Sequence, residues 1–392
     1  MRLLTALLLL LPTAAAPAAQ RAAPPTDTLA PDSEARWIPF DLTPGNQIRF
    51  TVTLDGQPIA AILDTGVSYT ALSRAYVTTH KLKVRSGGSA SAIGGLVPIG
   101  WIDPGTIRFG GLTRRGGSIS VASLPATATG STPVDMLVGR DLTAAYALDI
   151  DYAARRFRLL PSGRLPFTGV TAPLAVSPTR LVYSGEVTLN GRRLRPMIVD
   201  TGDGNAVTVS HEAWATTRLV PAALTSTISF GLGGAIVSDL AIVDTLQTGA
   251  LTAANVEVQI EGKGGFSHRL GMAGRIGSGF LQQYRVLLDP SAGRMVLQTG
   301  EQAGQMPLRS TSGLLVTAER NRLRVLHVMR GSPAAERGWK AGETICRVDD
   351  VAVPTAYAGS AYAGWSIGAP GRSVALDLCD GARRTLTLRT FY

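Results

Sequence analysis

Short stretches of alternating apolar and polar residues make up most of the chain beyond residue 36. They are rich in Val, Ile, Leu and Thr, and Gly, Asn, Asp and Pro stand between them. A period of two residues, with turn formers between the segments, is typical of short β-strands joined by hairpins. Helical patterns are sparse, and only "GRDLTAAYAL" and "GSGFLQQYRV" permit a short helix. The pattern therefore predicts a mainly β protein.

The strand pattern occurs twice, with the same landmarks in the same order. The segments "VTLDGQPIAAILDTG" and "VTLNGRRLRPMIVDTG" each predict a strand, a glycine turn and a second strand that leads into Asp-Thr-Gly. A glycine pair and a further glycine follow in each copy. The distance from Asp64 to Gly139 is 75 positions, and that from Asp200 to Gly277 is 77. An internal repeat of this kind predicts two similar β-lobes.

A different pattern begins near residue 306. The segment "LRVLHVMRGSPAAERGWKAGETICRVDDVAV" predicts a strand, a Gly-Ser-Pro turn, one helical turn capped by Ser332, a glycine-bounded loop and another strand. We therefore divide the folded chain into a first lobe over residues 36–162, a second lobe over 168–300 and a third domain over 306–392.

The first residues have the three-part pattern of a secretory signal peptide. Met1 to Ala19 contains one arginine, then "LLTALLLLL", then small residues. A membrane anchor is the alternative, but the apolar run is shorter than the roughly 20 residues that span a bilayer. We expect cleavage near Ala18 or Ala19, a periplasmic or secreted protein without a stable membrane span, and a flexible leader over residues 20–35.

Charge and the isolated side chains exclude several function classes. The net charge of +10 comes from scattered arginines without a basic run, so we expect no nucleic-acid partner. The four histidines lie apart from one another and from the cysteines, so we predict no metal site and no cofactor. Cys346 and Cys379 lie in strand-like segments. A disulfide and two buried thiols both fit an exported protein, and spacing alone does not decide between them.

An acidic residue ends each apolar strand of the repeat. Asp64 follows "AAIL" and Asp200 follows "MIV". Dehydration of a carboxylate is costly unless hydrogen bonds or a shifted pKa compensate for it. Two carboxylates about 3 Å apart share one proton, so that the pair is both an acid and a base. One member can then take a proton from water while the other protonates a carbonyl, which predicts hydrolysis of peptide bonds without a covalent intermediate.

The neighbours of the two acids suit such a pair. We expect the hydroxyl groups of Thr65 and Thr201 to brace one turn against the other, and Gly66 and Gly202 to let the two backbones approach closely. A single Asp-Thr-Gly is often only a tight turn. Its repetition, with the other landmarks at matched spacing, favours a shared catalytic site.

With these motifs the chain resembles a retropepsin-type aspartic protease in tandem, with two lobes fused as in pepsin. The resemblance covers residues 45–300 and implies two pseudo-symmetric β-lobes in a bilobal acid-protease fold, polypeptide substrates and a monomer. It also implies a flap hairpin in each lobe and an apolar-apolar-Gly element behind each active-site loop. The flap glycines would be Gly94, Gly95, Gly233 and Gly234, and the supporting elements would be Leu137 to Gly139 and Arg275 to Gly277.

Three residues depart from the family pattern. Val67 and Asp203 follow the Asp-Thr-Gly turns where the family usually has Ala or Ser, and Arg275 stands where an apolar residue is usual. The change to Val67 is mild. Asp203 places a third acid beside the pair, which predicts either a perturbed sharing of the proton or a second turn that is no longer catalytic.

The third domain resembles the small α+β PDZ domains appended to bacterial periplasmic proteases. By this resemblance a loop and strand edge would bind peptide C-termini or strands, with backbone N–H groups for a terminal carboxylate. The residues concerned are Ser312, Gly313, Leu314 and Leu315, and Leu315 stands where the family usually has a second glycine. The alternative is a domain that only packs against the lobes.

Two functions therefore remain from the sequence. The first is an exported aspartic endopeptidase whose PDZ domain assists in binding substrates or partners. The second is a catalytically inactive, protease-like scaffold that binds peptides. The two Asp-Thr-Gly turns favour the first, and Asp203 with the looser "GRIGSGF" favours the second. We expect no serine hydrolase, for want of a Gly-x-Ser-x-Gly elbow.

Overall fold

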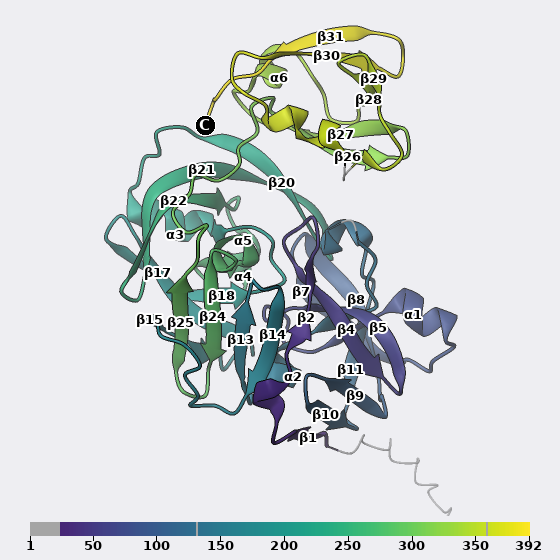
Figure 1. The fold of residues 1–392 in the computed structure, drawn as a ribbon, viewed down its shortest axis with the longest axis vertical. Coiled ribbons are helices and arrows are strands. Elements are labelled where there is room, and N and C mark those ends of the chain that lie inside the picture. The colour runs from purple at the N-terminus through teal and green to yellow at the C-terminus, as the bar shows by residue number, and fades with distance from the viewer. Residues whose placement is uncertain (1–23, 131, 358–359) are drawn as a thin grey trace, which may run out of the picture.

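A computed structural model describes residues 24–130, 132–357 and 360–392 (Figure 1). The predicted signal peptide over residues 1–19 lies outside the described residues. Strands dominate the chain and the helices are short, which confirms the prediction of a mainly β protein. Within the described residues, no helix is long and apolar enough to cross a bilayer.

The first lobe is built on one large sheet. Its strands are β1 (Thr26–Leu29), β3 (Asp41–Leu42), β4 (Ile48–Leu54), β5 (Gln57–Leu63), β6 (Ala71–Ser73), β7 (Arg85–Ala92), β8 (Gly95–Ile102), β9 (Thr106–Phe109), β10 (Leu112–Arg115), β11 (Ile119–Ala122) and β12 (Met136–Val138). The order is β1-β10-β9-β4-β5-β12-β6-β11-β8-β7, and β3 pairs with β4. The helices of this part are η1 (Ser33–Ala35), α1 (Arg74–Thr79), η2 (Ala126–Thr129) and α2 (Arg140–Thr143).

The second lobe has a corresponding sheet. Its strands are β16 (Ala175–Val176), β17 (Tyr183–Leu189), β18 (Arg192–Asp200), β19 (Val207–Val209), β20 (Thr225–Gly231), β21 (Gly234–Thr248), β22 (Leu251–Ile260) and β23 (Gly274–Gly277). They follow the order β16-β17-β18-β23-β19-β22-β21-β20. The helices are α3 (His211–Thr217), α4 (Phe266–Arg269) and α5 (Ser278–Leu281). Helices α2 and α5 are the two that the sequence permitted.

A third sheet joins the lobes. It contains β2 (Ile38–Pro39), β13 (Ala147–Asp151), β14 (Arg156–Leu160), β15 (Val170–Pro173), β24 (Tyr284–Asp289) and β25 (Arg294–Thr299). The order is β15-β25-β24-β13-β14-β2, so β13 of the first half pairs with β24 of the second. One apolar cluster includes residues of both lobes and of this sheet, among them Phe50, Phe157, Val199 and Leu288. The lobes therefore share a core, which fixes one against the other.

The strands form where the sequence alternates. In β4, Ile48, Phe50, Val52 and Leu54 are buried, and the residues between them face outward at least in part. Burial of one face of such a strand supplies the main favourable free energy of a sheet that packs on a core.

The internal repeat is visible in the topology. β12 lies between β5 and β6, and β23 lies between β18 and β19, each parallel to the strand that leads into Asp-Thr-Gly. A serine caps the helix after each unit, since Ser73 Oγ accepts from Ala75 N at 3.2 Å and Ser210 Oγ accepts from Ala213 N at 3.1 Å. The two halves thus place their Asp-Thr-Gly turns by the same local arrangement.

The prediction of a flexible leader is wrong for its described part. Thr26–Leu29 forms β1 and pairs antiparallel with β10. The Asp27 carboxylate accepts two hydrogen bonds from Arg114, at 2.7 and 2.6 Å, and the Arg114 side chain is almost fully buried. Composition indicated a linker, but the alternating "TDTL" and the ion pair of Asp27 with the buried Arg114 attach the segment to the first lobe.

The third domain has its own sheet and apolar core. Its strands are β26 (Leu314–Glu319), β27 (Arg322–Val328), β28 (Thr344–Val348), β29 (Val351–Ala352), β30 (Ser373–Leu378) and β31 (Arg383–Thr387), with helices α6 (Pro333–Glu336) and η4 (Ala361–Ile367). The order is β26-β27-β28-β30-β31, and β29 pairs with β28. Ser332 caps α6 as the sequence predicted. Cys346 and Cys379 form a disulfide, which decides between the two alternatives that their spacing left open.

This third domain sits on the second lobe, above β20 and β21 in Figure 1. Arg330 Nη2 donates to Thr225 O at 2.9 Å and to Asp239 Oδ1 at 2.8 Å. Ser226 Oγ lies 2.9 Å from His327 Nε2. The contacts therefore fall on β20 and β21, the two strands of the hairpin that the sequence analysis predicted to be the flap of the second lobe.

Candidate active site

The structure brings the two Asp-Thr-Gly turns together at the boundary between the lobes. Asp64 directly follows β5, and its backbone N–H donates to Val138 O at 2.9 Å. Asp200 ends β18 and is paired in register with Gly277. Each acid therefore stands where an apolar strand leaves a sheet, with the predicted supporting element beside it.

The two threonines hydrogen-bond the turns to each other. Thr65 Oγ1 donates to Val199 O at 2.7 Å and accepts from Thr201 N at 3.0 Å. In return, Thr201 Oγ1 donates to Leu63 O at 2.7 Å and accepts from Thr65 N at 3.1 Å. Both threonines are fully buried. Four reciprocal hydrogen bonds without access to water fix the position of one turn relative to the other.

Each carboxyl group lies against the glycine of the opposite turn. A Cβ at Gly66 would lie 2.3 Å from Asp200 Cγ, and a Cβ at Gly202 would lie 2.3 Å from Asp64 Cγ. Only glycine leaves room for the carboxyl group at these two positions. The residue types expected from the sequence are thus required by the close approach of the two acids.

Burial raises the pKa of both carboxyl groups. The pKa of Asp64 rises well above its ordinary value because of burial, the charge of Asp200 and a hydrogen bond with Asp200. Burial raises the pKa of Asp200 to about 6; the charge of Asp203 adds to the rise and that of Arg275 opposes it. The pair therefore holds one proton near neutral pH, as general acid–base chemistry requires.

The tips of the two predicted flaps touch. The hairpins are β7–β8 and β20–β21, and Gly233 N donates to Ile93 O at 2.9 Å between them. A Cβ at Gly94 would lie 2.5 Å from Gly234 N, and one at Gly233 would lie 2.3 Å from Gly95 N. All four flap glycines thus meet at one contact, which closes the two hairpins on each other.

The tip of the second predicted flap reaches the first Asp-Thr-Gly turn. Leu232 packs against an apolar cluster of the first lobe that includes Leu137 and Val134, and Val67 packs against the same cluster. Because Val67 directly follows Asp64-Thr65-Gly66, the flap lies beside the acids rather than away from them.

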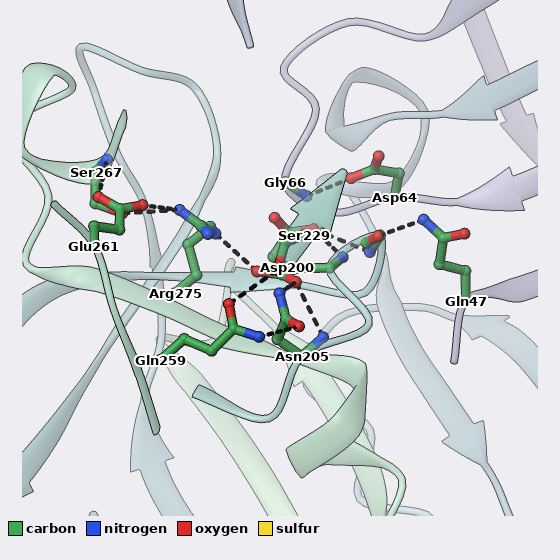
Figure 2. A network of polar contacts seen from close by, with 12 residues as sticks. Gln47, Asp64, Gly66, Asp200, Asn205, Ser229, Gln259, Glu261, Ser267 and Arg275 are labelled. Carbon is green, nitrogen blue, oxygen red and sulfur yellow. Dashed lines mark hydrogen bonds and ion pairs between the residues drawn. The ribbon is translucent and has the colours of Figure 1, made fainter. Parts of the chain in front are cut away.

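A buried ion pair that the sequence did not predict lies behind the second turn. Arg275 Nε donates to Asp203 Oδ2 at 2.8 Å. Arg275 Nη1 donates to Glu261 Oε1 at 2.6 Å, and Figure 2 shows these two residues side by side. The side chains of all three residues are at least 96% buried, with exposures of 2%, 4% and 2% for Arg275, Asp203 and Glu261. The two departures from the family pattern are therefore partners. Their opposite charges at neighbouring elements of the repeat were the signal that could have revealed the pair.

The same network extends to the second flap. Asp203 Oδ1 accepts from Asn205 Nδ2 at 2.7 Å, and Asn205 Oδ1 accepts from Gln259 Nε2 at 2.6 Å. Gln259 Oε1 then accepts from Ser229 Oγ at 3.0 Å, and Ser229 belongs to the flap strand β20 (Figure 2). A chain of hydrogen bonds thus joins the second turn to its flap.

Gln47 is a second residue that the sequence analysis missed. It comes from the first lobe, and its Nε2 donates to Gly202 O at 2.7 Å. Asn46 Nδ2 donates to Gly204 O at 3.1 Å from the same loop. Each of the two side chains donates a hydrogen bond to a backbone carbonyl of the other lobe. Because a backbone carbonyl requires no particular residue type, no sequence motif marks this contact.

The loop expected to bind a peptide carboxylate has its N–H groups already in use. Ser312 N donates to Ser366 O at 3.1 Å, Gly313 N to Ser310 Oγ at 2.9 Å, and Leu314 N to Ser312 Oγ at 3.0 Å. These three groups therefore do not form an open carboxylate site in this structure. Leu315 packs toward the second lobe. The outer side of β26 remains unpaired within the described sheet.

The expectation that no Gly-x-Ser-x-Gly sequence occurs is wrong. Gly364 to Gly368 has this pattern, with Ser366 at its centre. Ser366 lies in the 3-10 helix η4, whereas a nucleophilic serine of this type stands at a sharp turn from a strand to a helix. The segment belongs to the third domain and is not part of the aspartate site.

Comparison with known families agrees with this geometry in the first lobe. Residues 50–142 match the aspartyl protease family. The matched range contains Asp64, the first flap and Gly139, and it ends before the second lobe begins. No curated protein matches the chain. In the described residues, no group of three or more His, Cys, Asp and Glu side chains is arranged to hold a metal ion.

Proposed function

We propose that the chain is an exported aspartic endopeptidase that hydrolyses polypeptides between its two lobes. The reciprocal hydrogen bonds of Thr65 and Thr201 carry the proposal, because they hold Asp64 and Asp200 against each other's glycines in one chain. The family match of residues 50–142 supports the protease class.

The reaction needs one ionised and one protonated carboxyl group. The carboxylate takes a proton from water as the water oxygen bonds to the peptide carbonyl carbon, and the carboxylic acid protonates the carbonyl oxygen. The tetrahedral diol then breaks its C–N bond. The first carboxyl group returns its proton to the leaving nitrogen, and the second takes one from a hydroxyl group, which restores the starting state. Closed flaps exclude bulk water during these steps.

The inactive scaffold is the weaker candidate. It rested on Asp203 as an unbalanced third acid and on Arg275 as a misplaced cation. Because Arg275 pairs with Asp203 at 2.8 Å, neither residue argues against catalysis any longer.

The test uses a reduced, carboxymethylated protein as substrate and identifies the products by mass spectrometry. We expect the purified chain to release internal peptides, and Asp64→Asn and Asp200→Asn to release none. Asp41→Asn is the matched control, since Asp41 is exposed and lies outside the site. Equal activity of the two active-site variants and the control would refute the assignment.

Export and peptide binding by the third domain are separate parts of the proposal. The segment Met1 to Ala19 supports export, and N-terminal sequencing of the mature protein is expected to begin near Gln20. The unpaired side of β26 supports strand addition by a bound peptide. A mature protein that retains Met1 would contradict the export proposal.

A further inference from the structure

The two active-site turns differ at a pair of equivalent positions. Val67 follows the first Asp-Thr-Gly, and Leu137 lies on the strand that supports it; Val67 packs against the apolar cluster that contains Leu137. At the corresponding places of the second turn stand Asp203 and Arg275, which form the buried ion pair. The repeat therefore has an apolar contact on one side of the acids and an ion pair on the other.

Stability alone does not explain the ion pair. A buried ion pair loses much of its Coulombic gain to dehydration, and apolar residues of similar volume are often as stable or more so. The first lobe carries such an apolar pair at the same positions. The second lobe instead satisfies its charges fully, with Asn205 N and Nδ2 donating to Asp203 Oδ1 at 3.1 and 2.7 Å.

The ion pair is attached to one acid only. Asp200 Oδ1 accepts from Gly202 N and from Asp203 N, both at 3.0 Å. Asp64 Oδ1 accepts from Gly66 N at 3.0 Å. Val67 N and Asp203 N each donate to the backbone carbonyl of the acid three residues before, at 3.3 Å, and Asp203 N donates to the Asp200 carboxyl group in addition. Two N–H donors stabilise an anion better than one. The position of the Asp203 backbone, which its side chain fixes on Arg275, supplies the second donor to Asp200.

The charges of the ion pair act mainly on Asp200. Asp200 is affected by Asp203 and by Arg275, whose charges oppose each other, and Asp64 is affected by Asp200 and Asp203. Glu261 shares Arg275 with Asp203. The carboxylate of Asp203 raises the pKa of Asp200 more than Arg275 lowers it, so Arg275 offsets part of the effect of Asp203, and the backbone N–H of Asp203 supplies the hydrogen bond that favours the ionised form of Asp200.

We propose that Asp203 and Arg275 are positioning residues that keep Asp200 as the ionised member of the pair. Asp200 is then the base that takes the proton from water, and Asp64 is the acid that protonates the peptide carbonyl. This inference rests on the proposed peptidase function. It adds the assignment of the two roles and the cause of that assignment.

The experiment measures kcat/KM from about pH 4 to pH 9 on a short peptide. Asp203→Asn leaves the positive charge of Arg275 less balanced. It should move the acidic limb of the pH profile, where kcat/KM falls as the pH is lowered, to lower pH. Arg275→Leu leaves Asp203 uncompensated and should move the limb to higher pH. We expect shifts of about 0.5 pH unit or more, which is about threefold in kcat/KM at a pH below the limb.

Three further variants separate a charge effect from damage to the fold. Arg275→Lys keeps the charge and should keep the acidic limb of the unmodified chain. Glu261→Gln has the same shape but gives Arg275 one anion fewer, so the limb should move down as for Asp203→Asn. The double variant Asp203→Val/Arg275→Leu copies the apolar pair of the first lobe. Its acidic limb should lie at a pH between those of Asp203→Asn and Arg275→Leu.

The outcomes distinguish this inference from the proposed function. Active variants whose acidic limbs stay in place, or all move in one direction, would overturn the assignment and leave the peptidase intact. An inactive, folded chain would overturn the peptidase. In that case the shifts are measured from the pH dependence of the free energy of unfolding. Each variant is compared with the same variant that also carries Asp200→Asn, and the difference in free energy reports the titration of Asp200. The same pH dependence of this difference in every variant would overturn the assignment too.

Discussion

Replacing Asp200 with asparagine should make the protein more stable at neutral and alkaline pH while it abolishes activity. The pKa of Asp200 rises from 3.8 to about 6 on folding, because burial disfavours its charged form. A shift of about two pKa units corresponds to about 3 kcal/mol. A raised carboxyl pKa means that the folded state binds more protons than the unfolded state between pH 3.8 and about 6. The contribution of Asp200 to the free energy of unfolding is then largest below pH 3.8 and is lost as the pH rises through about 6.

Asp200→Asn removes this dependence without removing the hydrogen bonds. An asparagine carbonyl oxygen can still accept from Gly202 N and Asp203 N, and the amide cannot ionise. We therefore expect little change in the free energy of unfolding at pH 4 and a gain of up to about 3 kcal/mol at pH 8.

Denaturant unfolding followed by tryptophan fluorescence, at pH steps from 4 to 8, measures the effect. Asp41→Asn is the control and should follow the unmodified chain at every pH, because Asp41 is exposed. Parallel stability curves for Asp200→Asn and the unmodified chain would refute the reasoning, since they would mean that Asp200 is not buried as an anion in the folded state.

Three other predictions concern the hydrogen bonds between Thr65 and Thr201, the disulfide and the third domain. Thr65→Val or Thr201→Val should each lower the free energy of unfolding by about 2–4 kcal/mol and reduce activity, because two buried hydrogen bonds are lost. Replacement of either threonine by serine keeps both hydrogen bonds and is the control. Thermal unfolding measures the effect, and unchanged stability of the valine variants would contradict the prediction. Reducing the Cys346–Cys379 disulfide should destabilise the third domain by about 2–4 kcal/mol and leave hydrolysis of short peptides unchanged. An unaltered thermal unfolding profile under reducing conditions would mean that the disulfide does not stabilise the domain. Removing residues 306–392 should preserve cleavage of short peptides and slow that of long unfolded chains. It should also increase hydrogen exchange in β20, which loses its contacts with the third domain. A truncated protein that is folded but inert would show that the domain is part of the site.

Local sequence patterns predicted the parts of the fold that depend on neighbours along the chain. The repeat placed both Asp-Thr-Gly turns after apolar strands, and the structure has them at the ends of β5 and β18. Thr65 and Thr201 were predictable because a motif that pairs with its own copy needs hydroxyl groups at this point. Ser332 as a helix cap was predictable for the same local reason.

Features that depend on residues far apart in the sequence could not be predicted in this way. Arg275 lies 72 positions from Asp203, so no local pattern joined them, and their opposite charges at neighbouring elements of the repeat were the signal that could have pointed to the pair. Arg114 holds Asp27 across 87 positions and turns a segment of linker composition into β1. Gln47 acts on a carbonyl 155 positions away, and a backbone acceptor leaves no trace in the sequence.

Complementation between inactive chains tests the central claim most directly, namely that the two turns of one chain form one peptidase site. Asp64→Asn and Asp200→Asn are purified separately, shown to be folded by circular dichroism, mixed in equal amounts and assayed on a short peptide. Because the lobes of a single chain share a core and a sheet through β13 and β24, we expect the mixture to be as inactive as either variant, while the unmodified chain hydrolyses the peptide. Activity that returns on mixing would show that the site forms between two chains and would contradict the account.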